Sequence, residues 1–218
     1  MILLNPICEL FVENYLNYFF GKKFFELEKK LKKENFPIVS RIVGYFLSQI
    51  VLVKKPKYIL ELGTGVGLST IYMAFVIKKF KLPTKIVTLD IRQDFYNKAK
   101  EIFKLFNVED VIDHKLIDST SFLKETFTSF DLIFFDHEKS KYKKDLEIIL
   151  NRNLVNPFGI IIIDNLFGRG EIFLPNSKRK RKQVLSSFID YLFSSQVLKR
   201  AFVNILPISD GLGFLTFF

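Results

Sequence analysis

Four short runs of apolar residues recur along the chain, and stretches with helical periodicity alternate with them. The runs occupy residues 58–62, 85–89, 131–135 and 159–163 and are rich in Ile, Leu, Val and Phe. The amphipathic stretches read STIYMAFVIKKF, FYNKAKEIFKLF and YKKDLEIILNRNL. Strands that are apolar on both faces and alternate with helices are typical of a parallel sheet covered by helices on both sides. The sequence therefore predicts an α/β fold.

The two ends of the chain depart from this alternation. Near the C-terminus, VNILPI and GFLTFF are separated only by residues 209–212, which contain the hairpin signal Asp210-Gly211. Near the N-terminus, KKFFELEKKLKKENF has apolar residues at helical spacing and is ended by Pro37, and VSRIVGYFLSQIVLV indicates a second helix. We therefore predict one domain over 1–218, with a helical extension at 1–52 and an α/β core at 53–218 that ends in an antiparallel hairpin.

Composition excludes several classes of protein. The 218 residues are 49% hydrophobic and include 26 Phe, which is enough apolar surface to exclude a disordered chain. The single cysteine, Cys8, excludes an internal disulfide and favours a reducing compartment. The N-terminus lacks the basic segment of a signal peptide, and no apolar run reaches the ~20 residues of a membrane span. We expect a soluble, cytoplasmic protein with no membrane partner.

The net charge of +10 has two readings. It favours a polyanionic partner such as nucleic acid, but a lysine-rich solvated surface explains it equally well. The run Lys178–Lys182 is the densest basic segment. It follows the strand end at Asp164-Asn165, so it lies either near the mouth of a site at that end or in a solvated loop.

A glycine-rich segment, ELGTGVG at 61–67, lies between the first strand and the helix that begins at Ser69. Glycines at such a corner let a ligand approach bare main chain at a helix N-terminus. The dinucleotide fingerprint requires Gly or Ala where this chain has Leu68, which disfavours a dehydrogenase. Asp90 closes the second strand, where a carboxylate can accept both hydroxyls of a ribose. The combination predicts a site for a nucleoside cofactor.

Acidic side chains also follow two later strands. Asp136 ends the strand that begins at Asp131, and Asp164-Asn165 end the next strand. Neighbouring strands lie about 5 Å apart, so these three side chains converge at the carboxyl edge of the sheet. Two crowded carboxylates favour a cation between them, and this oxygen-rich set suits Mg²⁺, with Mn²⁺ or Ca²⁺ as alternatives. We interpret His137 as a residue behind the ligands or in the substrate wall, whereas His114 carries no functional signal.

These motifs resemble a known family. ILELGTGVGLSTIYMA, VTLDI, FDLIFFDHEKSKY, GIIIIDN and LPISDGL are similar, in order and spacing, to the metal-dependent branch of the class I S-adenosylmethionine-dependent O-methyltransferases. That branch includes the catechol and caffeoyl-CoA O-methyltransferases. The resemblance covers roughly residues 35–218. It implies a Rossmann-like methyltransferase fold, with a seven-stranded, mostly parallel sheet and a reversed last strand, and it implies a homodimer.

The resemblance also implies roles for individual residues. The glycine loop would bind the methionine part of S-adenosylmethionine, Asp90 and Ile91 its ribose and adenine, and Asp118-Ser119 the adenine edge. The divalent metal would be held where the acidic strand ends meet, and Lys139 would be the general base beside it. The implied cofactor-binding set is Glu61, Gly63, Thr64, Gly65, Ser69, Asp90, Ile91, Asp118, Ser119 and Asp136. The implied metal ligands are Asp136, Asp164 and Asn165, and the implied catalytic residues are Lys139 and Asp136.

We therefore expect a metal-assisted O-methyltransferase that acts on a small catechol-like aromatic. One departure concerns the acceptor, because the animal catechol enzyme carries a glutamate shortly before its Asp-Gly-Leu and this chain has residues 206–209, LPIS, there. Some bacterial members of the family methylate 5-hydroxyuridine in tRNA, so a tRNA acceptor is the main alternative, and the basic run is its possible contact. A cofactor-binding module without catalysis is disfavoured, because the whole acidic set is present.

Overall fold

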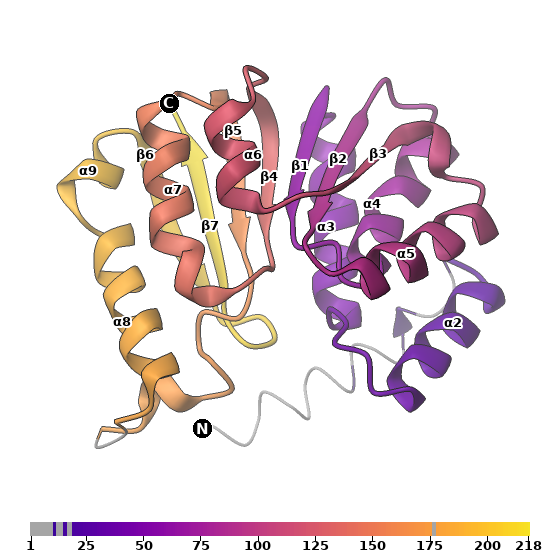
Figure 1. Cartoon of the computed structure of the whole chain (residues 1–218), viewed down its shortest axis with the longest axis horizontal. Helices are drawn as coiled ribbons and strands as arrows, with labels where there is room; N and C mark the ends of the chain where they lie inside the picture. The colour runs from indigo at the N-terminus through magenta and orange to yellow at the C-terminus, as the bar shows by residue number, and fades with distance from the viewer. Residues whose placement is uncertain (1–10, 12–14, 17–18, 176–177) are drawn as a thin grey trace.

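The computed structural model describes residues 11, 15–16, 19–175 and 178–218. Seven strands form one sheet in the order β3-β2-β1-β4-β5-β7-β6 (Figure 1). Cys8, and with it the interpretation of the cysteine content, lies outside the described residues. The strands are β1 (Tyr58–Leu62), β2 (Lys85–Asp90), β3 (Ile112–Leu116), β4 (Phe130–Phe135), β5 (Val155–Ile163), β6 (Ala201–Leu206) and β7 (Leu212–Phe217).

Helices cover both faces of the sheet. One face packs against α2 (Lys22–Lys33), α3 (Arg41–Lys54), α4 (Leu68–Lys79) and α5 (Gln93–Leu105). The other packs against α6 (Ser119–Glu125), α7 (Tyr142–Asn151), α8 (Lys180–Leu192) and α9 (Ser195–Leu198). Short 3₁₀ turns lie at η1 (Glu109–Val111), η2 (Lys139–Lys141) and η3 (Glu171–Phe173). Alternate strand residues enter opposite cores, as in β4, where Phe134 packs on the first face and Phe135 on the second.

The strand directions confirm the predicted sheet. Strands β1 to β5 pair in parallel, and β7 runs antiparallel to both β5 and β6. The hairpin differs in detail from the prediction, because β6 ends at Leu206 rather than running through Ile208. Pro207 has no N–H group to donate to a neighbouring strand, so the connection opens into a five-residue loop, 207–211.

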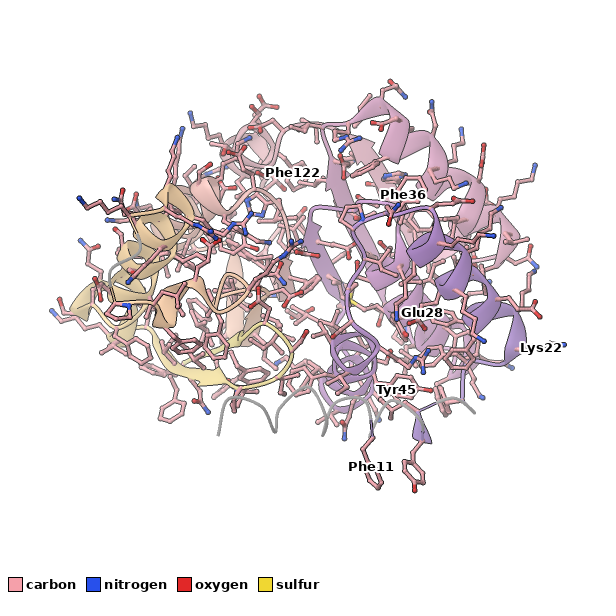
Figure 2. The ribbon with its side chains drawn as sticks, turned by 90° about the horizontal axis from the view of Figure 1, so that it is seen from below. Phe11, Lys22, Glu28, Phe36, Tyr45 and Phe122 are labelled. Atoms are coloured by element: carbon pink, nitrogen blue, oxygen red, sulfur yellow. The ribbon has the colours of Figure 1, made fainter. Side chains whose placement is uncertain are left out.

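The N-terminal helices share a core with the sheet. Helix α2 ends at Lys33, before the predicted stop at Pro37, because Asn35 adopts a left-handed conformation with φ 58°. Phe24 and Val43 are fully buried in the same cluster as strand residues. Figure 2 shows the polarity of α2, with Glu28 toward the body of the molecule and Lys22 at its outer edge.

Gly44 allows α3 to approach α4 closely. A Cβ atom at this position would lie 2.2 Å from the ring of Tyr72, which is itself fully buried. Across the described parts of the chain, no helix combines the length and the hydrophobicity needed to cross a membrane.

Glu61 anchors the corner between β1 and α4. Its side chain is fully buried and accepts hydrogen bonds from the hydroxyls of Ser69 (2.5 Å), Thr70 and Thr88 (2.6 Å). Burial raises the pKa of Glu61 from its ordinary value of 4.5 to about 7, although the three hydroxyl donors oppose this change. The carboxyl group therefore ties the end of β1 to the start of α4 and to β2.

Replacing Glu61 with Gln should remove a pH dependence of folding stability. The folded protein holds a proton on Glu61 between pH 4.5 and about 7 that the unfolded chain releases. The stabilisation from this proton is fully present below about pH 4.5 and is lost as the pH rises to about 7. The wild-type free energy of unfolding should therefore fall by up to about 3 kcal/mol relative to the variant, at about 1.4 kcal/mol per pKa unit. Urea unfolding of both proteins across this range tests the prediction, and parallel pH curves would contradict it.

Candidate active site

A cleft of about 720 Å³ opens at the carboxyl ends of the parallel strands. It lies where the chain order reverses between β1 and β4, the point at which open α/β sheets bind their ligands. Glu61 does not line the cleft and lies behind it, in the buried corner described above. Every other residue predicted for the site lines it: Gly63, Thr64, Gly65, Ser69, Asp90, Ile91, Asp118, Ser119, Asp136, Lys139, Asp164 and Asn165.

The glycine loop touches the neighbouring strand end directly. Gly63 has φ +102°, and a Cβ atom there would lie 2.6 Å from the carbonyl oxygen of Asp136. Only glycine fits this backbone conformation and this close approach. The contact places the loop beside the acidic strand ends.

Asp90 is held at the cleft by main-chain donors. Its two carboxylate oxygens accept hydrogen bonds from the N–H groups of Gly65 (2.8 Å) and Arg92 (2.8 Å). Burial raises the pKa of Asp90, and these hydrogen bonds oppose the increase. The next residue, Ile91, is 60% exposed and offers an apolar surface within the cleft.

The turn before α6 forms another part of the wall. Asp118 is the N-cap of α6 and accepts a hydrogen bond from the N–H of Ser121 (3.1 Å). It also pairs with Lys141, which comes from the turn after β4. Two turns that are distant in sequence therefore meet at this wall.

The acidic strand ends meet as predicted, with Asp164 the more buried. Asp164 is 3% exposed, and its carboxylate accepts a hydrogen bond from the N–H of Asn165 (2.7 Å). Burial raises the pKa of Asp164 to about 7, and the charge of Asp136 adds to the increase. Over the described ranges, no three His, Cys, Asp or Glu side chains form a metal-binding group. The predicted ligands, Asp136, Asp164 and Asn165, contain only two side chains of these types, because the third is an amide.

Lys139 lies beside this pair. Its ammonium group donates to Asp136 Oδ1 (3.1 Å) and to the hydroxyl oxygen of Tyr142 (2.8 Å). Tyr142 is fully buried and donates its own hydrogen toward the carbonyls of Phe135 and Asp164, each 3.2 Å away. Its oxygen is thus oriented to accept from Lys139.

Three residues in and around this site have no distinctive signal in the sequence. Tyr142 is the first residue of an amphipathic helix, and Asp145 is one of several polar residues in the same helix. The side chain of Asp145 is fully buried and lies 2.8 Å from Nε2 of His137. Asp210, noted only as a turn residue, lines the cleft, and its carboxylate accepts from the N–H of Arg169 at 2.6 and 2.8 Å. Only the folded chain brings these groups together.

The basic run reaches the cleft at one residue. Arg181 lines the cleft, whereas Arg179 precedes α8 and pairs with Glu171 at 2.8 Å. Lys180 to Lys182 lie in α8 rather than in a loop, because the helix begins at Lys180. The last three residues of the run therefore form the first turn of a helix at the edge of the cleft, and the first two precede it.

Comparisons with known proteins show the family to which the chain belongs. The family model described as O-methyltransferase matches residues 21–216. A caffeoyl-CoA O-methyltransferase of Stellaria longipes is 28% identical over 202 residues, which cover 85% of this chain and 81% of that protein. Catechol O-methyltransferase B of Danio rerio is 25% identical over 169 residues, which cover 72% of this chain and 62% of the fish protein.

A solved structure shares the whole architecture. The SAH-bound methyltransferase PaMTH1 of Podospora anserina superposes with a TM-score of 0.82 and 27% identity, over 95% of this chain and 94% of that one. This similarity confirms the Rossmann-like methyltransferase fold expected from the sequence. The chain belongs to the O-methyltransferase family of S-adenosylmethionine-dependent transferases.

Proposed function

We propose that this protein transfers the methyl group of S-adenosylmethionine to a hydroxyl of a small catechol-like aromatic, with the help of a divalent cation. The observation that carries the proposal is the position of Asp136, Asp164 and Lys139 in the same cleft as the glycine loop. A donor site and a site for activating a hydroxyl therefore adjoin, as methyl transfer requires.

The cofactor side of the cleft matches the parts of S-adenosylmethionine. The glycine loop at the start of α4 leaves main chain open to the methionine end, with Ser69 at the helix N-terminus. Asp90 presents carboxylate oxygens suited to ribose hydroxyls. Ile91 and the Asp118–Ser119 turn would then face the adenine. SAH bound to the Podospora relative supports this assignment.

The side chains of Asp136, Asp164 and Asn165 fit a divalent cation chemically. Asp164 is buried beside a like charge, and within the described part of the chain the hydrogen bond to its carboxylate comes from a single backbone N–H. Asp136, Asp164 and Asn165 supply hard oxygen donors, which suit Mg²⁺, Mn²⁺ or Ca²⁺. When bound there, a divalent cation would lower the pKa of an acceptor hydroxyl and fix its direction. The names of the catechol O-methyltransferase relatives support a vicinal diol as the acceptor.

As the neutral amine, Lys139 would take the proton from the acceptor hydroxyl and become the ammonium. Asp136 and the hydroxyl oxygen of Tyr142 hold Nζ of Lys139 beside the acidic strand ends, where the lysine lines the cleft. Methyl transfer is an in-line displacement in which the acceptor oxygen forms a bond to the methyl carbon as the carbon–sulfur bond breaks. A base fixed beside the acceptor leaves the oxygen deprotonated and aimed at that carbon.

A nucleic-acid acceptor is the second candidate. Arg169 and Arg181 line the cleft, and Lys178, Lys180 and Lys182 continue this positive edge. Basic side chains at the mouth of a site bind phosphates without reading sequence. This arrangement supports a tRNA hydroxyl as the alternative methyl acceptor.

Asp90→Ala should weaken cofactor binding more than it affects chemistry. The variant loses hydrogen bonds to two ribose hydroxyls, each worth roughly 1.5–3 kcal/mol because the acceptor is charged. Calorimetric affinity for S-adenosylhomocysteine should fall at least about 100-fold, because the two bonds together are worth about 3 kcal/mol or more. Asp94→Ala removes an exposed carboxylate outside the cleft and should bind normally. An unchanged affinity for Asp90→Ala would refute its role.

Removal of metal should abolish methyl transfer, and Mg²⁺ or Mn²⁺ should restore it. Asp164→Ala should be inactive but should still bind S-adenosylhomocysteine, because the glycine loop and Asp90 lie on other strands. Relief of carboxylate repulsion means that this variant should melt no lower than the parent in EDTA. Asp113→Ala, which removes an exposed carboxylate on β3, should keep metal-dependent activity. Full activity after exhaustive chelation would contradict the metal-assisted mechanism.

The basic edge should distinguish the two acceptors. If RNA is the acceptor, changing Lys178, Lys180 and Lys182 to Gln should weaken binding to unmodified tRNA and flatten its salt dependence, at about 0.7–0.9 in slope per lost phosphate contact. The matched control changes Lys54, Lys55 and Lys57, which precede β1 and therefore lie at the amino ends of the strands, away from the cleft. Methyl transfer to small catechols without measurable tRNA binding by the parent would favour the aromatic acceptor.

A further inference from the structure

A buried carboxylate on α7 holds two turns of the cleft together. Asp145 is fully buried, and its two oxygens accept hydrogen bonds from three side chains. Ser119 Oγ donates to Oδ2 at 2.8 Å, and Thr120 Oγ1 donates to Oδ1 at 2.6 Å. Nε2 of His137 lies 2.8 Å from Oδ2. Burial disfavours the charged form, yet these hydrogen bonds lower the pKa of Asp145, so the group remains a carboxylate.

The three donors belong to two different parts of the cleft. Ser119 and Thr120 begin α6, in the turn that faces the proposed adenine site. His137 follows β4 and stands next to Asp136. Asp145 is outside the cleft lining, so it can act on a ligand only through these neighbours.

The orientation of His137 depends on Asp145. Its side chain is 10% exposed, and Nδ1 is buried without a hydrogen-bond partner among the described residues. The hydrogen bond at Nε2 is therefore the polar contact that fixes the imidazole. Carboxylates that hold a histidine in this way set both its ring orientation and its tautomer.

The backbone of Asp136 and His137 also contacts the glycine loop. A Cβ atom at Gly63 would lie 2.6 Å from the carbonyl oxygen of Asp136 and 2.9 Å from the nitrogen of His137. A displacement of the Asp136–His137 peptide would therefore move into the loop that faces the cofactor. At the surface, the Lys141–Asp118 pair joins the same two turns a second time.

We propose that Asp145 is a positioning residue for the cofactor, which fixes the spacing between the α6 turn, the Asp136–His137 turn and the glycine loop. This inference rests on the proposed use of S-adenosylmethionine. Loss of the carboxylate lets the turns separate, so the cofactor must order them when it binds. Cofactor affinity falls while the bound complex still reacts. A carboxylate that merely stabilised α7 would lower the melting temperature and leave the affinity unchanged.

Two variants test this role in the full chain. Asp145→Asn keeps the shape but offers a single acceptor oxygen to the donors, and Thr120→Val removes one donor from a residue that is buried outside the cleft lining. Leu146→Ala is the matched control, since it truncates the adjacent, fully buried side chain of α7, which packs in the core. Calorimetry with S-adenosylhomocysteine, well below each melting temperature, measures the dissociation constants. Steady-state assays separate KM for S-adenosylmethionine from kcat.

Asp145→Asn should raise the dissociation constant and KM about tenfold or more, as loss of residues behind a site commonly does, with a smaller change in kcat. Thr120→Val should shift both constants in the same direction by less. Leu146→Ala should melt lower yet bind normally. If the parent binds and both test variants bind like Leu146→Ala, the positioning role is overturned while the proposed function stands. If the parent itself fails to bind S-adenosylhomocysteine, the proposed function and this role fall together.

Discussion

The close contact between Gly63 and the backbone of Asp136 determines how the rest of the site is arranged. Strands β1 and β4 are neighbours in parallel register, so the segments that follow them leave the sheet side by side. Because residue 63 has no side chain, the glycine loop passes directly against the peptide that carries Asp136. A larger residue would push the loop away from the strand end and separate the two halves of the cleft. The reacting atoms of a methyl donor and a hydroxyl acceptor must come within about 3–3.5 Å of each other before transfer, and this contact brings the two halves of the cleft together.

Three buried carboxylates around the cleft show how local donors decide the cost of burying a charge. Burial raises the pKa of Glu61 to about 7 despite three neutral hydroxyl donors. Asp164 has the same elevated pKa, because burial and the adjacent Asp136 both disfavour its charge. Asp145 has a lowered pKa, since an imidazole and two hydroxyls compensate its burial. Of the two carboxylates with a raised pKa, Asp164 lines the cleft and Glu61 lies behind it. Asp145, whose burial is compensated by its donors, keeps its charge outside the cleft lining.

The sequence predicted those parts of the structure that depend on local patterns. Apolar runs and Asp210-Gly211 were enough to predict the sheet and its reversed end, and strand-end positions were enough to bring Asp136 and Asp164 to one edge. The ends of elements were less predictable. Asn35 ends α2 through its left-handed backbone conformation, and Pro207 ends β6 because it has no N–H group to donate. The role of Asp145 was not predictable, because its partners lie on α6 and after β4, and no spacing in the sequence links them. The sequence also did not indicate that Glu61 lies behind the cleft, where its carboxylate accepts hydrogen bonds from the hydroxyls of Ser69 and Thr88.

The distribution of charge bears on the choice of acceptor. The chain carries a net charge of +10, but the cleft lining is balanced, with six basic and six acidic side chains: Lys32, Arg92, Lys139, Lys141, Arg169 and Arg181 against Asp90, Asp118, Asp136, Glu138, Asp164 and Asp210. The excess positive charge therefore lies outside the cleft. A small neutral aromatic would meet only the balanced interior, whereas an RNA would have to draw its electrostatic attraction from the edge, where α8 begins. The two proposed acceptors would thus differ in whether they use the edge of the cleft, and both would use the same interior.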